Sequence, residues 1–558
     1  MATASTKSSR KKQKRPGARP EQARTNGSPD PSVDAADLSR SNWLIASAGI
    51  LIVGAILRLY DLALVPLHHD EGVNGNFLIP LVHNGTYQYN PENYHGPTLY
   101  YFAAIVPWIC RLFGGKNFGE AYGLTTFNIR FVTAAFGVGT IGLVLLLRKR
   151  LGTIGALSAA ALIAISPGAV YLSRYFIHES LFVFFTLSIV VAALKYYDTA
   201  RPVYLILAAI SASLMIATKE TWIINGPVLL IALATTGIYF RLREKLSGNR
   251  SSGSTSSPAL MQRALERFGG AVSLTTVALV ALAIFIMIDV LFYSSFFTNY
   301  PKGVHDAVST LSMWRHRTTE HWHPWSQYLD WLREEEAPIL LLGAAGAVIA
   351  LWRSNNRFAV FIAQVAFGFL AAYSLVGYKT PWITLNFIVP LAITGGYALD
   401  VFLQRLVEFD QARLFIAVAV IVAGISGYQM FELNFVHYDD DKYAYVYAHT
   451  RRETLAMLDE IDRIAKRNGT GYETGISIVS PDYWPLPWYF RDYKHALFYG
   501  QIAPATEPIV IGSVAQEDEL KANYGGQYQL VSSGSADGSY SLRPGVDLLL
   551  YVRRDAVR

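Results

Sequence analysis

Charged residues are scarce in this chain of 558 residues. Only 16% are Asp, Glu, Lys or Arg, whereas hydrophobic residues make up 52%. Soluble domains carry roughly 25% charged residues, so the composition indicates an integral membrane protein. Cysteine is nearly absent as well, and the single Cys110 excludes both an intramolecular disulfide and a cysteine-based metal site.

Two further features restrict the function. No Gly-rich phosphate loop opens any helix predicted in the C-terminal part, so we expect no nucleotide cofactor. The net charge of +6 does not indicate nucleic acid as a partner, because the basic residues lie where a membrane protein needs them.

Residues 1–41 hold the densest basic run, Arg10 to Arg15, in a Ser-, Pro- and Gly-rich context. We predict a disordered cytoplasmic tail there.

Long apolar segments fill residues 42–430. A helix needs ~20 residues to cross a bilayer, and about eleven segments approach that length: 43–60, 127–147, 153–171, 180–197, 203–217, 222–240, 272–293, 337–352, 358–376, 381–401 and 412–428. A twelfth, 98–113, is short, aromatic and interrupted by Pro107, which is typical of a juxtamembrane or re-entrant helix.

Basic residues orient these segments, because cytoplasmic loops carry an excess of Lys and Arg. If 98–113 does not cross, the basic tail and the clusters at 148–150, 195–201, 241–267, 353–357 and 405–413 all lie on one side. If it crossed, Arg148-Lys149-Arg150 would move outside. We therefore predict a multi-pass protein of the cell membrane with a cytoplasmic N-terminus, and outer loops 61–126 and 294–336.

The composition becomes that of a soluble domain over residues 431–558. Leu455, Leu458, Ile461 and Ile464 have helical spacing within 450–468. Strand-like runs follow at 476–479, 508–511 and 547–552, with a short helix at 517–522. Alternating helices and strands predict a small exocytoplasmic α/β domain.

The outer face gathers ionisable residues at the ends of spans. An outward-facing site cannot reach cytosolic nucleotides, so a group-transfer substrate must arrive activated on a lipid, and a polyprenyl-phosphate sugar meets that requirement. Transfer needs a base for the acceptor hydroxyl. Asp70, in His68-His69-Asp70-Glu71, is the candidate, with Glu71 as its partner, and we expect one of these two adjacent carboxylates to have its pKa raised by the other. Capping of a helix is the alternative role.

Cations must stabilise the departing phosphate. Arg174, Lys219 and Lys379 stand at span ends on the outer side, where snorkelling to the interface is the alternative explanation. His178-Glu179 could hold a divalent metal ion together with Asp70 or Glu71. The 294–336 loop, rich in Trp and His, could cover a site or form an interfacial aromatic belt.

Several short motifs together resemble those of the C-type (GT-C) membrane glycosyltransferases, nearest to the dolichyl-phosphate-mannose protein mannosyltransferase and aminoarabinose transferase branch. They are Asp70-Glu71, His95-Gly96-Pro97, Asn128-Ile129-Arg130-Phe131 and Tyr171-Leu172-Ser173-Arg174-Tyr175. Within that superfamily, His69-Asp70-Glu71, Tyr94 to Pro97, Lys379-Thr380-Pro381-Trp382 and Pro481 to Trp488 are similar to the flippase activity-associated subfamily.

The resemblance implies a GT-C fold and an inverting transfer of a sugar from a polyprenyl-phosphate donor to a lipid-linked glycan or a protein. It places Asp70 near the acceptor or a metal. We also expect His95, Tyr378 and Trp382, which lie in or beside these motifs, to contact the substrate. His95-Gly96-Pro97 departs from the His-Pro-Pro of the mannosyltransferases, which puts a protein acceptor in doubt. A flippase or transporter of lipid-linked sugars and a non-catalytic membrane scaffold remain as alternatives.

Overall fold

The structure is a computed structural model that describes residues 38–93, 95–114, 123–246, 266, 268–313, 321–353, 355–535 and 538–556. The predicted basic tail within 1–37 and most of the basic loop 241–267 lie outside the described residues. The same holds for Trp314 and His316 of the aromatic loop.

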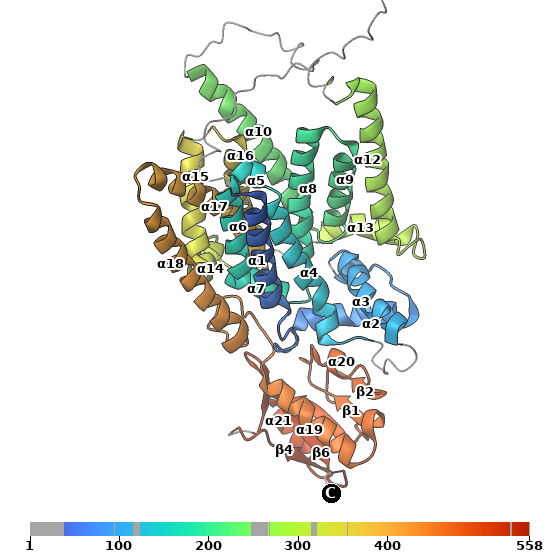
Figure 1. Cartoon of the computed structure of the whole chain (residues 1–558). Helices are drawn as coiled ribbons and strands as arrows, with labels where there is room; N and C mark the ends of the chain where they lie inside the picture. The colour runs from blue at the N-terminus through green and yellow to red at the C-terminus, as the bar shows by residue number, and fades with distance from the viewer. Residues whose placement is uncertain are drawn as a thin grey trace, which may run out of the picture.

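Long helices form a bundle with a small sheet domain at one end (Figure 1). The bundle comprises α1 (Arg40–Leu59), α4 (Thr126–Leu145), α5 (Arg148–Leu151), α6 (Thr153–Ile165), α7 (Pro167–Ser173), α8 (Glu179–Thr199), α9 (Pro202–Ile216), α10 (Trp222–Leu246), α12 (Gly270–Tyr293), α15 (Ala337–Arg353), α16 (Arg357–Ser374), α17 (Leu385–Glu408) and α18 (Ala412–Phe431). Each of the predicted apolar segments coincides with one of these helices or with a bent pair of them.

Eight of the described helices are long and apolar enough to cross a membrane, and up to ten if two bent pairs count as spans. The pairs are α6 with α7, bent by 60°, and α14 (Gln327–Glu335) with α15, bent by 113°. The helix α9 was predicted to span but has only 15 residues. The ambiguous segment is α3 (Thr98–Gly114), a helix of 17 residues with Pro107 inside.

Burial separates the centre of the bundle from its lipid-facing shell. The span containing α17 is 89% buried, whereas the strongly apolar α12 is only 6% buried and α18 11%. Close contact of α17 with its neighbours depends on glycine: a Cβ on Gly346 of α15 would lie 2.1 Å from the Thr394 carbonyl oxygen, and one on Gly396 2.3 Å from that of Gly155. Small residues of this kind let membrane helices approach each other closely.

The two ends of the bundle differ. The helices α2 (His69–Asn84) and α3 lie at the end next to the C-terminal sheet, and the end of α10 and the start of α12 lie at the opposite end (Figure 1). The outer loop 61–126 and the C-terminal region therefore share one end, as the distribution of basic residues predicted. Which end faces the cytoplasm stays a prediction.

The C-terminal region carries a six-stranded mixed sheet of order β2-β1-β3-β6-β4, with β5 also paired to β6. The strands are β1 (Gly475–Ile478), β2 (His495–Phe498), β3 (Ile509–Ser513), β4 (Tyr528–Val531), β5 (Tyr540–Arg543) and β6 (Val546–Arg553). The helix α19 (Glu453–Arg467) packs Met457, Ile461 and Ile464 onto the sheet, and α21 (Glu517–Tyr524) follows β3. Strands β1, β3 and β6 were predicted, but β2, β4 and β5 were not.

Candidate functional site

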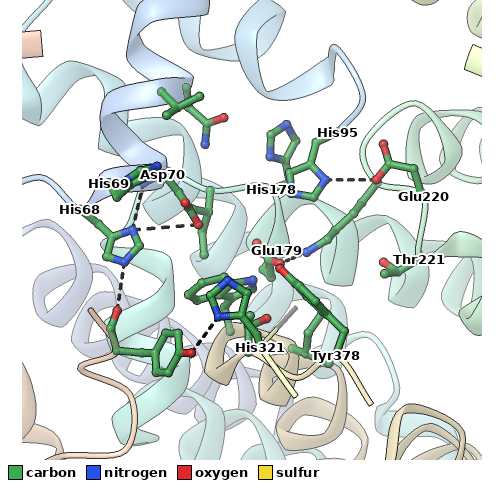
Figure 2. A pocket seen from close by; sticks show the side chains of 18 of the residues that line it. His68, His69, Asp70, His95, His178, Glu179, Glu220, Thr221, His321 and Tyr378 are labelled. Carbon is green, nitrogen blue, oxygen red and sulfur yellow. Dashed lines mark hydrogen bonds and ion pairs between the residues drawn. The ribbon is translucent and has the colours of Figure 1, made fainter. Parts of the chain in front are cut away.

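A cavity of about 880 Å³ lies where the bundle, α2 and the C-terminal region meet. The residues predicted for the site that line it are Asp70, His95, His178, Glu179, Lys219, Tyr378 and Trp382. They come from segments up to about 300 positions apart in sequence, and the structure brings these seven of the predicted residues to one cavity. Figure 2 shows most of them around the open centre.

The first turn of α2 is held by an unusual cap, His68. The Nδ1 atom of His68 accepts a hydrogen bond from the Asp70 amide at 3.0 Å, and Nε2 donates to the Tyr447 carbonyl oxygen at 3.0 Å. Glu71 completes a capping box by accepting from the His68 amide. Burial lowers the pKa of His68 to about 4, so the imidazole is neutral at pH 7 and its tautomer is set by the two partners.

Asp70 and Glu71 have opposite environments although they are adjacent. The Asp70 side chain is 41% exposed and lines the cavity. Glu71 is fully buried and forms a bidentate ion pair with Arg130, at 2.7 Å to Nε and 2.6 Å to Nη2. Glu71 also accepts from the Phe176 amide at 2.7 Å. The prediction that Glu71 assists Asp70 in the site is therefore wrong, because the Glu71 side chain does not line the cavity and instead links α2 to Arg130 of α4.

The wall opposite Asp70 contains two acid–base pairs. The ammonium group of Lys219 donates to Glu179 Oε1, and both side chains are buried. Beside them His95 Nδ1 lies 3.1 Å from Glu220 Oε2. The predicted positions of His95 and Lys219 at the cavity are thus seen, and Glu220 adds a carboxylate that was not among the predicted site residues.

The predicted metal pair does not form a metal site. His178 Nε2 donates to the Gly96 carbonyl oxygen at 3.1 Å, and the Glu179 carboxylate is occupied by Lys219. Burial holds the pKa of His178 well below its usual range. Within the described ranges no group of three or more His, Cys, Asp or Glu side chains is arranged to hold a metal ion.

Aromatic residues form the third side of the cavity. Residues 321–323 lie against 377–379: the Lys379 amide donates to the His321 carbonyl oxygen and the His323 amide to that of Gly377, each at 3.1 Å. This pairing brings Tyr378 and His321 to the cavity, and His321 Nδ1 lies 2.9 Å from the Tyr447 hydroxyl (Figure 2). Trp382 follows at the start of the α17 span, close to His68.

Two of the predicted phosphate contacts are turned away from the cavity. Arg174 donates to three carbonyl oxygens at the end of α1, those of Leu57, Tyr60 and Asp61, at 2.6 to 3.2 Å. The Lys379 ammonium donates to the carbonyl oxygens of Val376 and His323. Both side chains are buried and outside the cavity lining. These predictions are wrong for the described conformation, because carbonyls exposed at helix ends take up the charge.

The C-terminal region forms part of the cavity wall. Its segment 482–489 packs directly on α2: a Cβ on Gly72 would lie 2.5 Å from Pro485 Cβ, and one on Gly75 2.5 Å from the Trp488 ring. Trp484 and Arg543 line the cavity beside His69. Sequence reasoning missed both as site residues, although Trp484 lies in the aromatic run Pro481 to Trp488, whose density of rings was a usable signal.

Comparison with known proteins supports the fold. Residues 102–247, about a quarter of the chain, match the family "Dolichyl-phosphate-mannose-protein mannosyltransferase". No curated protein matches the sequence. Among solved structures, ArnT from Cupriavidus metallidurans bound to undecaprenyl phosphate matches with a TM-score of 0.57 and 14% identity, over 92% of this chain and 98% of that chain. AglB from Archaeoglobus fulgidus, in complex with an inhibitory peptide and a dolichol-phosphate, matches with a TM-score of 0.52 and 14% identity, over 90% and 74%.

The structural matches confirm the GT-C fold that the short motifs predicted, and the family match over residues 102–247 agrees with the predicted superfamily. A polytopic helical bundle with a small C-terminal sheet region is common to prediction and structure. The narrower resemblance to the flippase activity-associated subfamily stays a prediction.

Proposed function

We propose that the protein transfers a sugar from a polyprenyl-phosphate carrier to an exocytoplasmic acceptor, a lipid-linked glycan or a protein, in the cavity at Asp70. The observation that carries the proposal is the cavity itself. It places the accessible Asp70 carboxylate opposite the buried Lys219 ammonium, in a chain with the GT-C fold. A general base and a cation facing each other are what a single displacement at an anomeric carbon needs.

Asp70 is the proton acceptor in this reaction. The acceptor oxygen attacks the anomeric carbon, the bond from that carbon to the lipid phosphate oxygen breaks, and the acceptor proton passes to the Asp70 carboxylate. Attack opposite the leaving group inverts the anomeric centre. The Lys219 ammonium has three donors, one of which holds Glu179, so the others can bind the phosphate as its charge grows.

The lining of the cavity supports a lipid-borne donor. Beside the polar groups lie apolar side chains near the ends of the spans: Ile177, Ile223, Ile224, Val376 and Ile383. A cavity with a polar and an apolar part suits a phosphate attached to a prenyl chain. Two of the similar solved proteins have undecaprenyl phosphate or a dolichol-phosphate bound, which supports the same class of donor here.

Reconstitution into liposomes with a polyprenyl-phosphate hexose, labelled in the sugar, tests the proposal. We expect the label to leave the lipid and to appear on an acceptor added to the outer face, with release of polyprenyl phosphate. A transporter would move the labelled lipid across the bilayer intact, and a scaffold would leave it unchanged and in place. Either of those results would overturn the proposal.

A further inference from the structure

The cavity has two cationic side chains among its described lining residues, and they lie in different parts of the molecule. Lys219 belongs to the helical bundle, and Arg543 ends strand β5 of the C-terminal sheet. Two of the five lining histidines, His68 and His69, add little positive charge, since burial lowers the pKa of each to about 4. The lysine and arginine side chains that an anion can meet among the described lining residues are Lys219 and Arg543.

The two cations hold their carboxylate partners differently. Lys219 and Glu179 are 3% and 2% exposed, so either charge would be left buried if the pair opened. Arg543 is 14% exposed, and its partner Asp482, at 2.6 Å from Nη2, is 53% exposed. Solvent can take up the Asp482 carboxylate at little cost. Exchange of the partner carboxylate for another anion is thus easy at Arg543 and difficult at Lys219.

Arg543 is aimed at the cavity by local backbone geometry. The pairing of β5 with β6 shifts register between Ser541 and Arg543, and a bulge of this kind redirects a side chain at the edge of a sheet. Nη1 of Arg543 donates to the Trp484 carbonyl oxygen at 3.1 Å. The Trp484 ring in turn lies 6.1 Å from the His69 ring, next to Asp70. Arg543 and Trp484 therefore belong to the wall that carries the proposed base.

We infer that Arg543 and Trp484 bind the acceptor, and that the acceptor is an acidic glycan whose phosphate or carboxylate group replaces Asp482 on Arg543. The inference rests on the proposed function, because inversion requires the acceptor on the side of Asp70, away from the donor phosphate. Guanidinium groups bind both oxyanions in bidentate fashion. The half-buried Trp484 ring offers an apolar face to the sugar ring beside the anion.

Ligand-observed NMR on the full chain in lipid nanodiscs tests this, with glucose 6-phosphate, glucuronate and glucose as probes. We expect the two acids to bind and glucose to bind at least 10-fold more weakly. Arg543→Gln should weaken binding of the acids by about 10- to 100-fold, because a charge-assisted contact is lost. Arg554→Gln is the matched control: Arg554 is an exposed arginine of the same sheet region outside the cavity lining, and the change should have no effect.

Asp482→Asn separates a binding role from a structural one. If Asp482 competes with the acceptor for Arg543, the variant should bind the acids as tightly as the wild type or up to about 10-fold more tightly. If Arg543 only holds the 482–489 segment in place, Asp482→Asn should weaken binding as Arg543→Gln does, and that result would overturn the inference. Equal binding of glucose and the acids would overturn it too.

Undecaprenyl phosphate, titrated separately, distinguishes the acceptor from the donor. Its affinity should be unchanged in Arg543→Gln, and a loss confined to this lipid would place Arg543 at the donor phosphate instead. None of these measurements needs turnover. Binding of the acids without cleavage of the donor would therefore reject the proposed function and leave the acid site of Arg543 standing.

Discussion

Two buried ion pairs, Glu71–Arg130 and Glu179–Lys219, lie at the cavity. They differ in how many further hydrogen bonds their charged groups make within the protein. Behind α2, Glu71 accepts from Arg130, the His68 amide and the Phe176 amide, and Arg130 also donates to the carbonyl oxygens of Leu62, Val65 and Pro66. Across the cavity, Glu179 and Lys219 line the open space. The Glu71–Arg130 pair does not line the cavity and stabilises the fold, whereas the Glu179–Lys219 pair lines the cavity and can contact a ligand there.

The largest effect is expected from Glu71→Gln. The change leaves the Arg130 guanidinium buried without a counter-charge, and breaking a buried pair in this way costs about 3–5 kcal/mol. Thermal unfolding in detergent should show a strongly lowered Tm or failure to accumulate folded protein. An unchanged Tm would show that this pair does not hold α2 in place.

A smaller loss of stability, which depends on pH, is expected from protonation of His68, the residue that caps α2. The pKa of His68 is about 4 in the folded protein and near 6.5 when unfolded. Between these values the unfolded chain binds more protons, so the contribution is complete above pH 6.5 and is lost as the pH falls toward 4. At pH 5 the loss is about 2 kcal/mol.

The matched variant for that measurement is His68→Asn, since Asn can cap the helix but does not titrate. The free energy of unfolding of the variant should depend less steeply on pH between 4 and 6.5. Identical pH profiles for wild type and variant would contradict the assignment. His449, whose ring centroid is 4.7 Å from that of His68, is also held neutral by burial, so some pH dependence should remain.

A smaller effect on stability than at Glu71 is expected from Glu179→Gln, the same chemical change. The Lys219 ammonium is 3% exposed but lines the cavity, so we expect a loss of at most about 3 kcal/mol, the low end of the range for a broken buried pair. The affinity for polyprenyl phosphate should change clearly. A destabilisation as large as that of Glu71→Gln, with unchanged lipid affinity, would erase the distinction between the two pairs.

Sequence reasoning found the helices because apolar length is a local property. The different roles of Asp70 and Glu71, by contrast, could not be predicted from the local sequence. Neighbours on a helix point about 100° apart, and only the position of Arg130 on another helix decides which carboxylate is buried. Arg130 lies in the Asn128-Ile129-Arg130-Phe131 motif, so a partner for one acidic residue was visible in the sequence, but not which one it would take.

The cations show the same limit. Arg174 and Lys379 have the charge and the sequence position expected of phosphate contacts. In the structure, however, both side chains donate hydrogen bonds to backbone carbonyl oxygens of nearby turns. Arg543 ends strand β5, which was not predicted, and no motif in the sequence singled it out. Its place in the cavity follows from the docking of segment 482–489 on Gly72 and Gly75, a contact across more than 400 positions that no local pattern encodes.

Cleavage of a sugar-labelled polyprenyl-phosphate donor by the Asp70→Asn variant tests the central claim most directly. Asn keeps the size and the helical position of Asp70 but cannot accept the proton, and a general base contributes typically 10²–10⁴-fold to a rate. We predict a loss of turnover of at least about 100-fold, with a Tm and an affinity for polyprenyl phosphate like those of the wild type. Turnover within a few-fold of the wild type would contradict the account.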